Sequence, residues 1–557
     1  MSSRVQKIMS TVLAVVFLAG GLRLAETLNG LRERMDLVQS DLAVQARPDL
    51  LTNVLLSVGR ALAVDYLWIG LQQMQQEGRY FDAQQRAEWI CQLQPRFPAV
   101  WVFHSWNTAY NISVTMTRPE DRWRWVRNGF ELLRDRGIPL NPRSIALYRQ
   151  LAWIFEHKIG GMTDDFHWYY KVELANQIEP IVGFGDSDKY DIMAKAPLTW
   201  DNLLDLPKMK EFISALESVR VNPHDRSFLD LLTKRDELGE KVVALLDNPD
   251  YRECVDMLEG YLRSQWLYDE WKMDSRLIGD LRREDMYGPL DFRTPEAHAM
   301  YWCYKGLKMA GEKTTFDALA TFVGEEKDAS FDALNTKRIM AAALQDIVFR
   351  GRFVITDFGP LITPDVRFIP TEHRLYLALG KAYAEGNGEQ WDGTAGEQFK
   401  SGHVNFLRKA ISLYYQYGDE AKAREYWNIV KKLYPLKEYD VGMESYMHKY
   451  ILGDLQDQSM RDINMTIDGF LVQAYQRYAF GDDYSALAME RYAKMLYQAY
   501  QDRKQWILPS NRVTLPPWDE IVSKVREQVL QSLPAELKDR LRKRLGIESS
   551  REVSTEK

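Results

Sequence analysis

The sequence predicts an all-α protein in which antiparallel helix pairs stack on one another as a solenoid. One spacing occurs twice: Gly78 and Pro95 are seventeen residues apart, and so are Gly418 and Pro435. Each glycine closes one short segment of helical periodicity and each proline follows the next, which is typical of a helix-turn-helix repeat of about 34 residues. No segment alternates clearly between apolar and polar residues with period two, so we expect no sheet.

The composition is that of a folded protein with more than one core. The chain has 557 residues, of which 46% are hydrophobic, 27% charged and 12% aromatic, and this aromatic content argues against disorder. A net charge of −7 argues against a general nucleic-acid binder, which needs a basic surface. Cys91, Cys254 and Cys303 have no C-x-x-C spacing, so buried thiols are favoured over a disulfide framework or a zinc site.

Residues 8–22 are uncharged and mostly apolar, with Arg4 and Lys7 before them and Arg23 after them. Two interpretations remain open for residues 1–25: an uncleaved signal anchor, which we favour, and a cleaved secretory signal peptide. A buried soluble helix is the third. Because basic residues precede the segment, a cytoplasmic N-terminus is favoured, and both leading interpretations carry the rest of the chain across a membrane.

Helical periodicity and Gly or Pro punctuation divide the remaining chain. Residues 26–63 are expected to form a helical stalk and residues 64–180 a block of three helix pairs. In that block, helices are expected over 64–93 (the first pair), 99–114, 119–137, 144–157 and 164–177, the last capped by Thr163 and closed by Pro180.

Residues 181–371 are expected to be helical but irregular. A long loop with short helices is predicted over 184–206, helices over 212–219, 225–246, 251–271, 295–309 and 332–349, and a turn over 360–364. Regular pairs resume in residues 372–503, with helices over 372–384, 404–417, 420–433, 464–480 and 483–500 and a glycine-rich loop over 386–396. Residues 504–557 are expected to supply two capping helices, 517–530 and 534–545, and a loose tail.

The best-spaced units resemble the tetratricopeptide repeat family. Its pattern is matched by Leu67, Gly78, Tyr80, Ala83, Ala87 and Pro95, and less fully by Leu407, Ile411, Gly418, Ala421 and Pro435. The units between them depart from the pattern, with a longer arm at Pro119 and an extra gap at Gly160-Gly161. Together with the N-terminal segment, the chain resembles a membrane-anchored bacterial envelope repeat protein of a type with unknown activity.

The resemblance implies a right-handed superhelix whose concave groove is lined by the first helix of each pair and binds peptide segments. Carried over by position, the groove residues are Trp68, Gln72 and Gln75, then Trp106 and Tyr110, then Arg149 and Trp153, and finally Asn405, Arg408 and Ser412. Aromatic and amide side chains would give contact area and adaptable hydrogen bonds, and arginine could bind a carboxylate. The alternative is that the tryptophans fill the core between helices.

Two local clusters allow a chemical reading beside a structural one. His157, Asp164, Asp165 and His167 could converge on a metal, but acids at a helix N-terminus and a packed aromatic face account for them better. Arg122-Trp123-Arg124-Trp125 could clasp an anionic partner, but a packed helix whose arginines extend to solvent is favoured.

The sequence contains no nucleophile elbow, Walker A loop, H-E-x-x-H or G-x-G-x-x-G motif. We therefore predict a non-enzymatic scaffold of the bacterial cell envelope, bound to the cytoplasmic membrane through its N-terminal helix and facing the extracytoplasmic side. The expected partners are other envelope or secretion proteins, with no nucleic acid, metal or cofactor. The alternatives are an envelope hydrolase with its site in 183–360 and a structural stalk or lattice protein.

Overall fold

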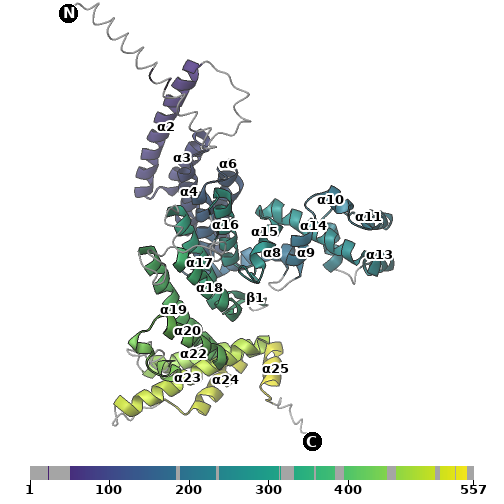
Figure 1. Cartoon of the computed structure of the whole chain (residues 1–557). Coiled ribbons are helices and arrows are strands. Elements are labelled where there is room, and N and C mark those ends of the chain that lie inside the picture. The colour runs from purple at the N-terminus through teal and green to yellow at the C-terminus, as the bar shows by residue number, and fades with distance from the viewer. Residues whose placement is uncertain are drawn as a thin grey trace, which may run out of the picture. The chain divides into compact units, whose positions relative to one another are not determined.

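The structure is a computed structural model that describes residues 20, 23, 50–183, 188–233, 238–312, 314, 331–356, 359–382, 394–447, 460–507, 515–533 and 535–547. These residues are almost entirely helical, so the prediction of an all-α fold is confirmed (Figure 1). The chain divides into two compact units, Met1–Glu77 and Gly78–Lys557. Each unit is described by itself.

In the first unit the structure describes one long helix, α2 (Leu50–Gln76), which runs across the predicted boundary at residue 63. Val64 and Leu71 are buried, whereas Leu62, Tyr66 and Ile69 are 65–70% exposed. The predicted anchor and most of the predicted stalk lie outside the described residues. Within the parts of the chain that the structure describes, no helix has the length and apolarity that a membrane span requires.

The second unit opens with the helices predicted for residues 80–180. These are α3 (Tyr80–Leu93), α4 (Pro98–Trp106), α5 (Pro119–Glu131), α7 (Ile145–Trp153) and α8 (His167–Val182). Gly78 has a φ of +73°, a left-handed conformation that glycine adopts without steric cost. Trp101 is buried and its Nε1–H donates to the carbonyl of Pro95 at 2.8 Å, so the turn between α3 and α4 is fixed by a core tryptophan.

Three helices of this block change their hydrogen-bonding pattern before they end. α4, α5 and α7 continue directly into the π-helical segments η2 (Asn107–Ile112), η4 (Leu132–Gly137) and η5 (Ile154–Ile159). Short helical turns then follow two of them, η3 (Ser113–Thr115) after η2 and α6 (Ile138–Leu140) after η4. The helix positions were predicted correctly, but the π-helical geometry was not predicted. It widens the backbone where side chains of neighbouring helices meet.

Three predictions about α8 are wrong. Thr163 does not cap the helix, because its N-cap position is Phe166. The helix begins at His167 and not at Asp164, because an Asp164 carboxylate oxygen accepts the backbone N–H of Phe166 at 2.9 Å and holds the preceding residues in a turn. Pro180 does not close the helix but lies inside it, and α8 ends before Gly183, which has a φ of +74°.

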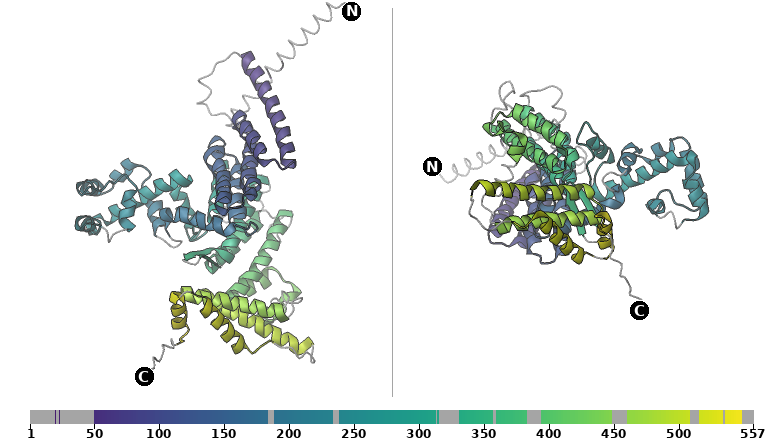
Figure 2. Two further views of the ribbon diagram at one scale, coloured as in Figure 1. Left: turned by 180° about the vertical axis from the view of Figure 1, so that it is seen from behind. Right: turned by 90° about the horizontal axis from the view of Figure 1, so that it is seen from below.

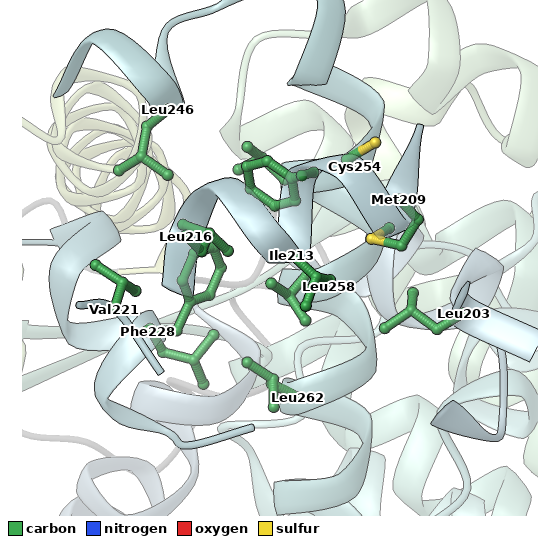
Figure 3. Close-up of a cluster of buried hydrophobic side chains, with 13 residues drawn as sticks. Leu203, Met209, Ile213, Leu216, Val221, Phe228, Leu246, Cys254, Leu258 and Leu262 are labelled. Carbon is green, nitrogen blue, oxygen red and sulfur yellow. The ribbon is translucent and has the colours of Figure 1, made fainter. Parts of the chain in front are cut away.

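Residues 189–282 form a run of short helices and one long helix, α14. They are α9 (Lys189–Lys195), α10 (Trp200–Leu204), α11 (Met209–Ser218), α12 (Ser227–Thr233), α13 (Glu240–Leu246), η7 (Pro249–Tyr251), α14 (Arg252–Trp271) and α15 (Ser275–Arg282). The single helix predicted over 225–246 is therefore wrong, since α12 and α13 are separate helices. Within this run, buried apolar residues between Leu203 and Leu262 form one core cluster, which Figure 3 shows with Leu203, Met209, Leu216, Leu258 and Leu262 pointing toward one another. Trp271, at the end of α14, packs instead on Phe130 and His298. We call residues 199–271 the insert module.

After these helices the chain returns to the third predicted pair. α16 (Pro295–Ala310) packs against α7 and η5, and α17 (Phe331–Arg350) packs against α16 and α7. The helices approach closely because Gly306 faces Tyr148, whose Cβ would lie only 2.5 Å from a Cβ added at Gly306. The predicted irregular region therefore contains a helix pair in direct contact with the first block.

A β-hairpin follows α17, which corrects the expectation of no sheet and of a turn over 360–364. β1 (Arg352–Thr356) pairs antiparallel with β2 (Gly359–Thr363), with Arg352 opposite Thr363. The Phe353 carbonyl of β1 accepts from the Arg293 guanidinium at 2.9 Å. Such a short ribbon is marginal alone and is held here by the helices around it.

The C-terminal part contains the predicted helices: α20 has the predicted bounds, α19 begins ten residues earlier than predicted, and the others differ by a few residues at one end or both. They are η10 (Val366–Phe368), α18 (Ile369–Ala382), α19 (Thr394–Gln416), α20 (Glu420–Leu433), η11 (Lys437–Tyr439), α22 (Met460–Phe480), α23 (Asp483–Ile507), α24 (Trp518–Ser532) and α25 (Ala535–Arg544). Consecutive helices pack from α17 through α20, and α22 lies beside α23, as the two views of Figure 2 also show. Gly418 and Gly481 adopt positive φ at the turns. Residues 386–393 of the predicted glycine-rich loop lie outside the described residues. The superhelical solenoid stays a prediction.

Candidate partner-binding surface

Four ring-bearing side chains form a continuous row across the neighbouring helices that end in η2 and η5. Trp106 stacks on Tyr110 with ring centroids 6.0 Å apart, Tyr110 faces His157 at 5.8 Å, and His157 stacks on Trp153 at 4.6 Å. Trp106 and Trp153 are the last residues of α4 and α7, and Tyr110 and His157 follow four residues later on the π-helical segments. We call these four side chains the aromatic row.

The aromatic row is partly open to solvent and carries no charge near neutral pH. Trp153 is 36% exposed, and the other three side chains are half-buried. Tyr110 Oη and His157 Nδ1 are 3.3 Å apart. Burial raises the pKa of Tyr110, whereas burial and the nearby Lys158 charge lower the pKa of His157. A neutral, half-exposed row of rings is suited to apolar and aromatic side chains of a partner.

A buried ionic network holds the row in place. Lys158 Nζ lies 5.3 Å from the Tyr110 ring centroid and pairs with Asp164 at 2.6 Å. Arg122 also pairs with Asp164, at 3.3 Å, and Tyr170 donates its hydroxyl to Asp164 at 3.2 Å. Burial opposes ionisation of Asp164, but hydrogen bonds from Lys158 and from the Phe166 N–H outweigh it and lower the pKa of the carboxyl.

This network also answers the metal hypothesis for His157, Asp164, Asp165 and His167. Asp164 forms ion pairs with Lys158 and Arg122, and His167 Nδ1 lies 3.2 Å from Lys171 Nζ. Among the described residues, no cluster of His, Cys, Asp or Glu is arranged to hold a metal ion. The favoured interpretation, acids at a helix N-terminus beside a packed aromatic face, is wrong in part: α8 begins at His167 and has no acid in its first turn, and Trp168 is 44% exposed whereas Tyr170 is buried.

Of the other predicted groove residues, Arg149 lies one turn before Trp153 and is bonded to Asp332 of α17. Its guanidinium therefore joins α7 to α17. Trp68 and Gln75 are half-buried and Gln72 is exposed on α2, in the first unit.

In the later unit, Asn405 is exposed, but its neighbours stabilise the fold. Arg408 donates to the Tyr439 hydroxyl at 3.0 Å and pairs with Glu438, and Ser412 is buried and accepts from Gln416 at 3.0 Å. The structure thus places Trp106, Tyr110 and Trp153 in one row, with Arg149 one turn away. Arg408 and Ser412 instead make separate contacts within the C-terminal part.

The Arg122–Trp125 segment is a packed helix, as favoured. Trp123 is buried against Phe130 and Tyr170, at ring distances of 6.1 and 6.0 Å. Arg124 extends into solvent, while Arg122 turns inward to Asp164.

Sequence reasoning missed a set of buried charged side chains on η5, α8 and α16 to α18. Glu156, Glu296, Asp346 and Glu372 supply carboxyl groups, and Lys171 and Arg350 supply cations. Arg350 Nε lies 3.6 Å from Glu296, and Arg350 also pairs with Asp346. Burial raises the pKa of both Glu156 and Glu296 to about 7. Glu296 and Glu372 are at most 2% exposed and lie inside the helix packing, whereas Glu156 is partly buried and the Asp346 side chain is 27% exposed.

A second cluster, Cys91 with His104 and Glu88, also lacks catalytic geometry. Cys91 Sγ and a Glu88 oxygen both approach the same imidazole nitrogen, Nδ1, at 4.0 and 3.8 Å. A catalytic triad needs the two partners on opposite nitrogens. Burial raises the pKa of Cys91 to about 12 and lowers that of His104 to about 4, so neither group is ionised at neutral pH.

Comparison with known proteins adds no family: no protein-family model matches the chain, and no curated protein matches it. The tetratricopeptide resemblance therefore stays a prediction.

His157 completes the aromatic row, although the sequence indicated it only as a possible metal ligand. A signal was present, since Trp106 and Tyr110 have the same four-residue spacing as Trp153 and His157, and this spacing places both rings on one helix face.

Proposed function

We propose that this protein is a non-enzymatic scaffold that binds a segment of a partner protein on the aromatic row. The single observation that carries the proposal is a partly exposed row of four neutral rings across two adjacent helices. Rigid aromatic side chains of this kind supply most of the binding energy in many protein interfaces, at little cost in conformational entropy.

The row also has the rigidity that recognition requires. The rings lie on helices, and the ion pairs of Asp164 with Lys158 and Arg122 fix η5 to the start of α5 and the turn before α8. A preorganised surface loses less conformational entropy when its partner binds, so more of the interaction free energy remains as affinity. The proposed partner segment is apolar or aromatic, because the row presents no net charge.

The proposed location is the bacterial cell envelope, with residues 1–25 as an uncleaved anchor and the bulk of the chain outside the cytoplasm. The support is the apolar run 8–22 with basic residues on both sides. Intact mass spectrometry of the protein from the membrane fraction is expected to give the full 64.9 kDa. A mature protein that lacks its first twenty or so residues would instead indicate a signal peptide.

Site-specific photo-crosslinking in intact cells tests the binding proposal. A photoreactive amino acid replaces Met162, which is 69% exposed and five residues beyond His157, and the crosslinked partners are identified by mass spectrometry. In the same chain, Trp106→Ala with Trp153→Ala is expected to lower the yield of a defined adduct at least about tenfold, since aromatic anchors at an interface each contribute about 2 kcal/mol or more.

Trp89→Ala provides the matched control, because Trp89 is a tryptophan with 45% exposure on α3 and is not part of the row. Its adduct yield is expected to stay within about twofold of the parent protein. Circular dichroism melts of all variants show whether the fold is retained. The proposal fails if no adduct forms, or if the row variant and the control lose it equally while remaining folded.

A further inference from the structure

The two inner rings of the aromatic row offer a partner their edges and not their faces. Tyr110 lies between Trp106 and His157, and His157 lies between Tyr110 and Trp153. Neighbouring ring planes are 12–33° from parallel, so the faces of each inner ring are turned toward its neighbours. An aromatic ring is partly positive at its edge and partly negative on its face. The accessible edges therefore attract electron-rich atoms such as carbonyl oxygens.

The row also carries hydrogen-bond donors that lack acceptors. Among the described residues, no acceptor bonds to the indole N–H of Trp106 or of Trp153, whereas the buried Trp101 donates to a backbone carbonyl. Tyr110 Oη lies 3.3 Å from Nδ1 of His157, and a hydroxyl that donates to Nδ1 leaves the imidazole proton on Nε2, a third donor. An indole N–H cannot accept, so the row requires acceptors from its partner.

This requirement distinguishes among the backbone conformations of a partner segment. The carbonyls of an α-helix are bonded within the helix and are not free to accept. An extended strand offers carbonyls but also N–H groups, and the row gives those N–H groups no acceptor, which lowers the affinity. A polyproline II segment has no internal hydrogen bonds, so its carbonyls are free, and proline has no N–H at all. A proline-rich segment therefore matches the donors of the row.

Proline also matches the row in polarity and in rigidity. Its ring is apolar and uncharged, as the side chains of the row are near neutral pH. A polyproline II segment is ordered before it binds, so it loses little conformational entropy. We propose that the aromatic row binds a proline-rich segment in the polyproline II conformation. This inference rests on the proposed function and names the class of partner segment.

Fluorine NMR of the full-length chain, labelled with fluorotryptophan and purified in detergent, tests the inference. The Trp153 resonance is assigned by its absence in Trp153→Phe. The probes are three uncharged, capped peptides: nonaproline, the nonamer of N-methylglycine, which has free carbonyls but no ring, and a lactam-stapled helix of alanine, leucine and glutamine. We expect nonaproline to shift the Trp153 resonance saturably with a Kd of about 0.1–1 mM, and the other two probes to bind at least about fivefold more weakly.

Trp106→Phe tests the hydrogen-bond argument, because it keeps an aromatic ring and removes one indole N–H. It is expected to weaken nonaproline binding about threefold or more. Trp89→Phe is the matched control, since Trp89 is 45% exposed on α3 and lies outside the row, and its Kd is expected to stay within about twofold of the parent. Circular dichroism melts show whether the variants are folded, and the comparison of the three probes uses the parent chain and does not depend on them.

The inference is overturned if nonaproline gives no saturable shift, if either other probe binds as tightly as nonaproline, or if folded Trp106→Phe binds nonaproline as tightly as the parent. The crosslinking experiment separates this inference from the proposed function. A defined adduct that depends on the row, without nonaproline binding, rejects the proline-rich class and retains the scaffold. Nonaproline binding without any adduct in cells rejects the scaffold and retains the binding chemistry of the row.

Discussion

Glu156 shows how a single buried carboxyl group makes stability depend on pH. Its Oε2 atom is buried on η5 and has no hydrogen-bond partner in the described structure. Its pKa is raised from 4.5 to about 7, chiefly by burial and also by the charges of Asp346 and Glu296, while Arg350 opposes the rise. Between these two values the folded chain holds a proton that the unfolded chain has released. The free energy of unfolding therefore falls as the pH rises from about 4.5 to about 7, and it does not recover above that.

Glu156→Gln is expected to remove this dependence, because the amide cannot ionise. The free energy of unfolding of the variant, relative to the parent, should increase by on the order of 1–3 kcal/mol between pH 4.5 and pH 8. Thermal melts across this pH range measure the difference.

The matched control is Glu527→Gln, an exposed glutamate in the middle of α24. Its difference from the parent at each pH is the baseline for removing one glutamate charge. A difference for Glu156→Gln with no larger pH dependence than this baseline would contradict the raised pKa of Glu156.

At the scale of elements, two helical glycines predict opposite effects of the same substitution. Gly306 faces Tyr148 across the α16–α7 contact, where an added Cβ would lie 2.5 Å from Tyr148 Cβ. Gly306→Ala is expected to lower the free energy of unfolding by about 1–3 kcal/mol, since the helices must move apart.

Gly469 is the comparison, because an added Cβ there meets nothing within 4 Å on α22. Gly469→Ala is expected to raise the free energy of unfolding by up to about 1 kcal/mol, from the better helix propensity of alanine. Thermal melts of both variants check the pair. A stabilising Gly306→Ala would contradict the close approach of α7 and α16.

The elements that sequence reasoning recovered are those with local signals. Gly78, Gly418 and Gly481 end helices through their own backbone freedom, and apolar periodicity located α14, α16, α17 and α20. The elements it missed depend on distant contacts. β1 and β2 are only five residues each and are stabilised by partners such as Arg293, and the π-helical segments arise where α4, α5 and α7 pack on other helices.

The candidate surface was recovered in part for the same reason. Trp106, Tyr110 and Trp153 were chosen because their positions match a repeat pattern; Trp106 stacks on Tyr110, and Trp153 is joined to them through His157. Arg408 and Ser412 were chosen by the same rule but are bound by Tyr439, Glu438 and Gln416. The buried carboxyl cluster could not be found, because Glu156, Glu296 and Asp346 are far apart in the sequence and carry no motif.

At the scale of the whole molecule, the insert module is expected to unfold as a separate unit, because it has its own core. Leu216→Ala removes a fully buried side chain from that core and should destabilise the module by about 2–5 kcal/mol. Hydrogen exchange measured by mass spectrometry should then accelerate in α10 to α13, with α4 and α7 unchanged.

Leu151→Ala is the contrasting variant, because Leu151 is fully buried on α7. It should accelerate exchange in α4, α7 and α16 and leave α11 unchanged. If both variants accelerate exchange along the entire chain, the module and the rest of the second unit unfold together.

The contact between α7 and α16 has a consequence for biosynthesis. While the ribosome is still making the insert module, the surface of α7 that includes Tyr148 has no helix to cover it, since Gly306 has not yet been translated. Long-range contacts of this kind slow folding and leave apolar surface exposed in the nascent chain. This face of α7 therefore stays uncovered until α16 has been synthesised much later. A chaperone would be needed most during this interval.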